Sequence, residues 1–187
     1  MTYGDGNTFD ILTSLDVCGH EIGHAVCTFT ADLAYQNQSG GMNEGYSDIW
    51  AAAVEHYGRT GSIEGAVDPN IWLIGEDINT PPLRSMSDPN SRNDPDTYLG
   101  RFWTSTGDEG TCVPAGGPTG NDFCGVHSNS GVLNHWFYLL TEGGSGTNNA
   151  PTPDTYDFPG IGLAKASEIA YITERDFLTS YVRSENS

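Results

Sequence analysis

The chain has 187 residues, enough for one domain of ordinary size, and its 25 acidic against 7 basic residues give a net charge of −18. Such a charge repels nucleic acid and anionic lipid, so neither is expected as a partner. No stretch approaches the ~18–20 apolar residues that a membrane-spanning helix requires.

The N-terminal part predicts a short extended segment followed by a helix. Residues 1–9 have the pattern of a strand end and a turn, and they lack the basic and apolar regions of a signal peptide. From Asp16 to about Leu33 (16–33), apolar residues recur at helical spacing, and Asp16 is the expected N-cap.

The rest of the chain predicts three more helices separated by loops. Residues 36–41 (QNQSGG) are expected to form a loop, and the second helix is expected over residues 43–57. Residues 58–126 hold most of the prolines and no long periodic run. Further helices are expected at about 129–140 and 162–180. Because no alternating strands and no repeat appear, residues 1–187 predict a single, mainly α domain with long loops.

The cysteines predict one disulfide. Cys18 and Cys27 are nine residues apart on one expected helix, about 13 Å along its axis, which is too far for a disulfide. Cys112 and Cys124 flank a Gly- and Pro-rich loop that can fold back on itself. We therefore expect a loop-closing disulfide between Cys112 and Cys124, and hence an oxidising compartment.

The segment HEIGH at 20–24 predicts a metal site. Residues four apart share a helix face, so His20 and His24 can bind one ion, while Glu21 is placed to reach a metal-bound water. The alternative is a pair of ordinary core or surface histidines, because the five letters can occur by chance.

The following segment, GMNEGYSD, supplies the groups that such a site lacks. Glu44 can be the third ligand of a catalytic zinc, and Asp48 can accept the free ring N–H of His20. Cys18 and Cys27 point away from the ligand face of the helix, and we expect both to be small buried apolar residues.

Several motifs in this order resemble those of the thermolysin family of zinc endopeptidases. They are HEIGH, AYQNQSG (34–40), NEGYSD (43–48), IGED (74–77), LRSMSDP (83–89) and GVHSNSGVLN (125–134). The resemblance covers almost all of the chain and implies the family's C-terminal helical domain, with the zinc helix at its start. It also implies one catalytic zinc on His20, His24 and Glu44, with Glu21 as general base.

The resemblance assigns further residues to the reaction itself. Tyr35 and His127 match a pair that hydrogen-bonds the oxyanion, Asp122 matches the carboxylate that holds His127, and Asn43 matches the residue that supports His24. Taken alone, Tyr35 could be a packing residue and His127 a structural one. His56 and His135 match no motif.

The resemblance also implies how a peptide or protein substrate binds. Arg84 matches an arginine that grips a backbone carbonyl, and Val17 and Leu83 match residues lining the pocket after the scissile bond. A hydrophobic preference at that position follows. Arg84 could alternatively do no more than neutralise a neighbouring acid.

Calcium is the second cofactor that the resemblance implies. Asp16, Glu55 and Glu76 match carboxylates of the family's main calcium site, and oxygen-rich sites suit this ion. Leu73 and Ile71 stand where two-ion members carry acids, so we expect one calcium. The alternative is three unrelated surface acids in a very acidic chain.

Family members also carry a β-rich N-terminal domain that supplies half of the substrate cleft. Residues 1–9 match only its end, so we expect a missing N-terminal domain, a missing propeptide, or both. The family and the expected disulfide imply a secreted protein. The alternative to a peptidase is a metal-binding fragment without activity, because half of the cleft is lacking.

Overall fold

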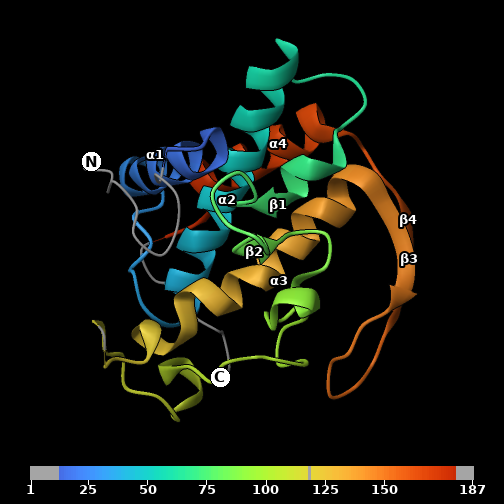
Figure 1. Ribbon diagram of the computed structural model, residues 1–187. Coiled ribbons are helices and arrows are strands. Elements are labelled where there is room, and N and C mark those ends of the chain that lie inside the picture. Colours follow the sequence, from blue (N-terminus) through green and yellow to red (C-terminus); the bar gives the residue numbers. More distant parts are fainter. Residues whose placement is uncertain (1–12, 118, 180–187) are drawn as a thin grey trace.

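The computed structural model describes residues 13–117 and 119–179, and its main elements are helices. Helix α2 (Asn37–Thr60) packs between α1 (Leu15–Phe29) and α3 (Asp122–Glu142), as Figure 1 shows. A shorter helix, α4 (Leu163–Ile172), contacts both α2 and α3. The arrangement confirms the predicted mainly α fold. Within the described residues, no helix has the length and apolarity needed to cross a membrane.

Glycines let α1 and α2 approach until their backbones touch. A Cβ atom added to Gly23 would lie 2.7 Å from the Cα atom of Ser47, and one added to Gly19 would lie 3.1 Å from that of Ala51. Larger side chains would therefore force the helices apart. Gly19 directly precedes His20, and Gly23 directly precedes His24, so this close approach brings the HEIGH segment against α2.

The predicted limits of α1 need correction. The N-cap is Ser14 rather than Asp16, which lies in the first turn with its carboxylate buried and accepts a hydrogen bond from Gly75 N. The helix ends at Phe29, four residues before the expected end at Leu33. Asp32 adopts a left-handed φ of 49° and its N–H bonds Cys27 O at 2.7 Å, which ends the helical pattern.

Helix α2 begins six residues before its predicted start, so the expected loop at 36–41 is almost entirely helical. The reason is packing against α3. A Cβ atom at Gly40 would lie 2.4 Å from Val126 Cγ1, and one at Gly41 would lie 3.4 Å from Asn129 Cβ. Contact with a distant helix thus overrides the weak helix propensity of a Gly- and Ser-rich segment.

The core lies around α2 and the inner faces of α3 and α4. Its fully or nearly fully buried members include Tyr46, Ile49, Ile71, Trp72, Ile74, Met86, Phe137 and Leu163. The last predicted helix is shorter than expected, because α4 ends at Ile172 and continues as a π-helical turn, Thr173–Phe177. In that turn Glu174 is fully buried and accepts a hydrogen bond from Trp50 Nε1 at 2.9 Å.

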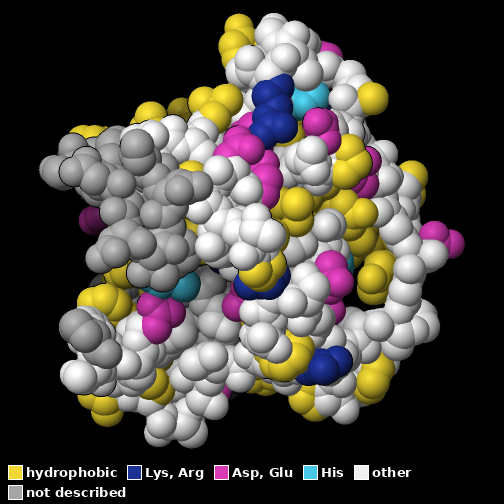
Figure 2. All heavy atoms as spheres, in the orientation of Figure 1, with side chains coloured by type: hydrophobic (Ala, Val, Ile, Leu, Met, Phe, Trp, Pro, Cys, Tyr) yellow, Lys and Arg dark blue, Asp and Glu magenta, His cyan; other side chains and the backbone are white. Residues whose placement is uncertain are grey.

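Two small antiparallel sheets were not predicted. Strand β1 (Leu73–Ile74) pairs with β2 (Arg84–Ser85), and β3 (Gly143–Thr147) pairs with β4 (Thr155–Pro159) in a hairpin along one side of the molecule (Figure 1). Short 3₁₀ turns complete the long loops at Pro69–Trp72, Pro89–Arg92 and Gly107–Glu109. Figure 2 shows acidic and apolar side chains interspersed over one face.

Candidate active site

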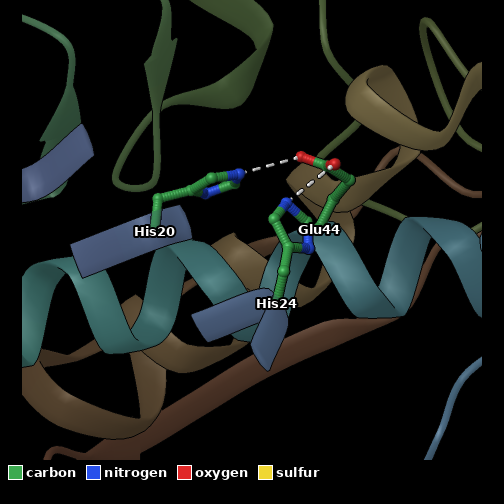
Figure 3. Close-up of side chains that lie close together, drawn as sticks. All are labelled: His20, His24 and Glu44. Carbon is green, nitrogen blue, oxygen red and sulfur yellow. Dashed lines mark ion pairs between the residues drawn. The ribbon is translucent and has the colours of Figure 1, made fainter. Parts of the chain in front are cut away.

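Three side chains from two helices converge on one point. His20 and His24 project from α1 toward Glu44 of α2 (Figure 3). His20 Nε2 lies 3.4 Å from Glu44 Oε2, and His24 Nε2 lies 3.4 Å from Glu44 Oε1. One ligand atom from each residue fits within a 4.8 Å cluster. Glu44 lies well inside α2 rather than at its start, but it shares a face with Asp48 as the sequence predicted.

The chemistry of this donor set fits zinc. Two imidazole nitrogens and one carboxylate leave one tetrahedral position open, which is the ligand pattern of catalytic zinc sites. Glu44 is fully buried, and its Oε2 accepts no hydrogen bond within the described part of the chain. Burial opposes its ionisation, but the interactions with nearby His20, Arg84 and His127 outweigh it and lower the pKa of Glu44 to about 2. The ligand is therefore ionised at neutral pH.

Asp48 holds the first histidine and the half-buried Arg84 together. Its Oδ1 lies 2.7 Å from His20 Nδ1 and accepts a bond from Arg84 Nη2, while Oδ2 accepts bonds from Arg84 Nε and Asn134 Nδ2, all at 2.7 Å. Burial alone would raise the pKa of Asp48, but the charges of Arg84 and His20 hold it well below its usual range. The carboxylate thereby fixes the ring of His20 with Nε2 turned toward the cluster.

The second histidine is held by uncharged partners. Its Nδ1 lies 2.6 Å from Asn43 Oδ1 and 3.0 Å from Ser47 Oγ. Asn43 in turn donates to Leu33 O at 3.0 Å, which anchors the support to the loop after α1. Sequence reasoning identified Asn43 but missed Ser47, which the i, i+4 spacing from Asn43 could have indicated.

The predicted pair Tyr35 and His127 lies beside Glu44, the third candidate ligand. Tyr35 OH donates to Glu44 Oε1 and lies 3.2 Å from His127 Nε2, which is itself 3.3 Å from Glu44 Oε1. Asp122 accepts two bonds from His127, from Nδ1 at 2.5 Å and from the backbone N at 3.0 Å. Burial and the charge of Glu44 raise the pKa of Tyr35, so its hydroxyl keeps its proton.

The remaining predicted residues surround this cluster. Glu21 follows His20 on α1 and is half-buried, as is Val17 one turn earlier. Leu83 is also half-buried, and its side chain packs on Gly75, where an added Cβ would lie 2.8 Å from it. Arg84 comes directly after Leu83 and points inward to Asp48.

The expected calcium carboxylates lie at the far end of α2. Glu55 is buried there beside Glu76, and Asp77 joins them in a second possible metal cluster. Asp16 is buried nearby. The pKa of Glu55 is raised to about 8, first by burial and then by the negative charges of Glu76 and Asp16. Arg59 pairs with Glu55, and its Nη2 lies 3.2 Å from Glu76 Oε1 and 3.5 Å from Asp77 Oδ2. Sequence reasoning missed both Asp77 and Arg59.

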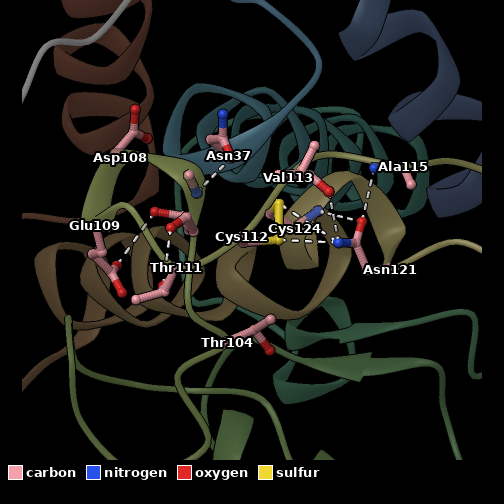
Figure 4. Close-up of a disulfide and its surroundings, with 12 residues drawn as sticks. Asn37, Thr104, Asp108, Glu109, Thr111, Cys112, Val113, Ala115, Asn121 and Cys124 are labelled. Atoms are coloured by element: carbon pink, nitrogen blue, oxygen red, sulfur yellow. Dashed lines mark hydrogen bonds between the residues drawn. A yellow bond between two sulfur atoms is a disulfide. The ribbon is translucent and has the colours of Figure 1, made fainter.

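The predicted disulfide is present between Cys112 and Cys124, and it closes the loop that precedes α3 (Figure 4). Cys27 is buried as expected, whereas Cys18 is only half-buried. Both are free thiols. Neither belongs to a possible metal cluster in the described residues.

The chain is similar to known metallopeptidases. A family model described as the thermolysin metallopeptidase alpha-helical domain matches residues 31–185, and one described as its catalytic domain matches residues 1–28. Bacillolysin from Bacillus caldolyticus and thermolysin from Alicyclobacillus acidocaldarius subsp. acidocaldarius are each 41% identical over 179 residues. These matches cover 91% of the chain but only 27% of either relative.

A solved structure resembles the fold as well. The precursor of protealysin, a metalloproteinase from Serratia proteamaculans, superposes with a TM-score of 0.50 and 29% sequence identity, covering 74% of this chain and 42% of that one. The chain thus spans about a quarter of the length of the curated relatives named above. With one family model over most of its length and relatives at 41% identity, the chain belongs to the thermolysin metallopeptidase family.

Proposed function

We propose that this chain is the catalytic portion of a zinc endopeptidase that hydrolyses peptide bonds. The convergence of His20, His24 and Glu44 beside Tyr35 and His127 carries the proposal, because a purely structural zinc needs no such neighbours. Family membership supports it independently.

In this proposal one zinc ion is held by His20, His24 and Glu44, and it supplies Lewis-acid activation of water and of the substrate carbonyl. Glu21 takes the proton from the attacking water and passes it to the leaving amine. Its place beside His20 on α1 suits this role, because its side chain diverges from the ligand face yet stays next to it.

Two hydrogen-bond donors stabilise the negative charge that develops on the substrate's carbonyl oxygen. The Tyr35 hydroxyl is one, and His127 Nε2 is the other when it carries a proton. In the present structure both groups lie on Glu44 Oε1, and they exchange that contact for the substrate oxygen. Asp122 fixes the plane of the His127 ring through the Nδ1 bond.

The substrate is a peptide or protein with a hydrophobic residue after the scissile bond. Val17 and Leu83 are half-buried apolar side chains next to the zinc helix and to Arg84, which suits the wall of a small apolar pocket. Arg84 commits two N–H groups to Asp48, and its remaining donors are available for a backbone carbonyl.

One structural calcium is proposed at the far end of α2. Three buried carboxylate oxygens there accept no hydrogen bond within the described residues, namely Asp16 Oδ1, Glu55 Oε2 and Glu76 Oε2. Acidic oxygens without donors suit a hard divalent cation. Asp77 is a further candidate ligand.

The full protein is proposed to be secreted and to include an N-terminal domain or propeptide. The disulfide supports the oxidising compartment, and the short coverage of the relatives supports the additional part.

Parallel samples of the chain and its Glu21→Gln variant test the function. Zinc content is measured by elemental mass spectrometry and cleavage with a quenched-fluorescent peptide. We expect one zinc in both proteins and a loss of at least about 100-fold in kcat for the variant only. Folded protein without zinc would refute the site. Zinc with no cleavage by the parent chain would favour the non-catalytic, metal-binding fragment.

A further inference from the structure

The backbone turn just before His127 is left-handed. Asp122, Phe123, Cys124 and Gly125 have φ values of 56°, 50°, 72° and 76°. Only glycine adopts this region freely, and a bulky residue such as phenylalanine rarely does. A run of three non-glycine residues in this conformation therefore needs support from the surrounding structure.

This turn is what allows Asp122 to reach His127. Residues five apart on a regular α-helix point about 140° away from each other, so their side chains do not meet. Here the left-handed turn brings the carboxylate back over the start of the right-handed part of α3. It receives bonds from both Nδ1 and the backbone N of His127. The orientation of the imidazole thus depends on the turn.

The loop at residues 112–121 is bonded to the turn at residues 122–125 at several points (Figure 4). The disulfide joins Cys124, in the middle of the turn, to Cys112. The Asn121 side chain accepts bonds from Ala115 N at 2.8 Å and Cys124 N at 3.2 Å, and it donates to Val113 O at 2.9 Å. Cys124 is fully buried and Cys112 is half-buried, so the bridge joins the partly exposed loop to the interior of the turn.

The aromatic residue of the turn adds to the same support. Its N–H bonds Ala115 O at 3.1 Å, and its ring covers Gly116, where an added Cβ would lie 2.2 Å from the ring. The ring of Phe123 also packs edge-on against that of Tyr35, with centroids 5.7 Å apart. Loop, turn and both oxyanion donors therefore form one connected unit.

We propose that the Cys112–Cys124 disulfide and Asn121 are positioning groups for His127: they hold the left-handed turn that keeps Asp122 on the imidazole. The inference rests on the proposed peptidase function for its effect on turnover. Its structural half, the orientation of His127, is independent of that function.

A matched pair of variants separates this role from general stabilisation. C112S/C124S and C112S/C124G both lack the disulfide, but only glycine at position 124 relieves the left-handed strain at φ 72°. We expect C112S/C124S to lose about 10-fold in kcat with KM and zinc content within about 2-fold of the parent. C112S/C124G should recover to within about 3-fold of the parent kcat.

Nitrogen-15 NMR of histidine-labelled protein supplies a readout that needs no activity. It reports which ring nitrogen of His127 carries a proton, with H127N used to assign the signal. We expect Nδ1 of His127 to carry a proton in the parent and in C112S/C124G, whether or not Nε2 carries one too, because Asp122 accepts from Nδ1. In C112S/C124S we expect a mixture of tautomers, in which Nδ1 is protonated in only part of the molecules. An unchanged spectrum and kcat in C112S/C124S would overturn the proposal, as would equal losses in the two double variants.

Two further outcomes, a parent chain without activity and a double variant that does not fold, still leave the proposal testable. If the parent chain binds zinc but cleaves nothing, the peptidase function fails for this chain, while the NMR comparison still decides the role of the disulfide. If C112S/C124S does not fold, N121A decides, because it keeps the disulfide but removes the side-chain bonds to Ala115, Val113 and Cys124. A mixture of tautomers in N121A supports the proposal, and an unchanged His127 signal overturns it.

Discussion

Helix α2 buries carboxylates in two regions, and these regions behave in opposite ways. In its N-terminal half, called here the first end, Glu44 and Asp48 are fully buried and their pKa values are lowered, to about 2 for Glu44. Near its end, Glu55 is as deeply buried, but its pKa is raised to about 8. All three carboxylates belong to the same helix and are shielded from solvent, so burial, which by itself raises a carboxyl pKa, does not explain the lowered values.

The difference comes from the partners that each end faces. Asp48 has the guanidinium of Arg84 and the ring of His20 within hydrogen-bonding distance. Glu55 has Glu76 and Asp16 nearby, and only the partly exposed Arg59 opposes them. Desolvation disfavours both charges, and neighbouring cations overcome it at one end only. The first end carries enough cations of its own, whereas at the second end the proposed calcium ion would supply the missing positive charge.

The strongest test of this contrast is Asp48→Asn in the metal-free chain. The amide keeps the shape but removes the charge that Arg84 and His20 face, which leaves the largely buried guanidinium of Arg84 without a carboxylate partner. We expect a loss of about 3–5 kcal/mol in the free energy of unfolding, measured by urea denaturation at pH 7. Glu168→Gln, an exposed position on α4, is the control and should change little. A loss below about 1 kcal/mol would mean that the network at the first end does not stabilise the fold.

The matching change at the other end, Glu55→Gln, should have the opposite sign. Because folding raises the pKa of Glu55 from 4.5 to about 8, its contribution to stability is present below about pH 4.5 and lost as the pH rises through 8. Without calcium at pH 8, we expect Glu55→Gln to stabilise the chain by on the order of 2 kcal/mol. Calcium at 100 times its Kd should stabilise the parent by about 2.7 kcal/mol and the variant by much less.

The outcome also tests the calcium proposal. Equal stabilisation of parent and variant by calcium would place the ion elsewhere. Destabilisation by Glu55→Gln in calcium-free solution at pH 8 would mean that the bond to Arg59 matters more than the repulsion between the acids.

Glu174 is an intermediate case, because its partner is a neutral donor. Burial raises the pKa of Glu174 to about 7, although Trp50 Nε1 donates to it. The shift is upward, so stability is present below about pH 4.5 and lost as the pH rises through 7. In the Glu55→Gln background we expect a loss of about 1–2 kcal/mol between pH 5 and 7.5, followed by calorimetry. Glu174→Gln should flatten this profile and Glu168→Gln should not, and identical slopes would contradict the assignment.

The grouping of the candidate site residues was more predictable from the sequence than the limits of the helices around them. His20, His24, Glu44 and Asp48 depend on helical i, i+4 spacing, which is local and readable. Their approach depends on glycines at 19 and 23, whose role becomes visible only with α2 packed against them. The bond from Asn134 to Asp48 joins residues 86 apart, and no local pattern indicates it.

The errors have a common cause in long-range contacts. Helix α2 starts at Asn37 because Gly40 meets Val126, more than 80 residues away. The left-handed turn at 122–125 carries a phenylalanine that by itself disfavours the conformation, so only the loop from Cys112 onward explains it. Arg59 was missed because its role depends on Glu76, which belongs to another element.

The smallest expected effect concerns Arg59, and it tests whether the second end of α2 has a partial cation of its own. Arg59 binds Glu55 Oε1 and Glu76 Oε1, whereas the oxygens without donors are Oε2 on both residues. The guanidinium of Arg59 and a calcium ion can therefore bind these carboxylates at the same time, and each reduces the negative charge available to the other.

We expect Arg59→Met to lower the free energy of unfolding by about 1 kcal/mol without calcium, because the ion pair is partly exposed to solvent. By linkage, calcium should then stabilise Arg59→Met more than the parent, seen as a larger rise in Tm on titration. If calcium raises Tm equally in both, the arginine and the ion act on separate groups, and the second end would resemble the first in carrying its own counter-charge.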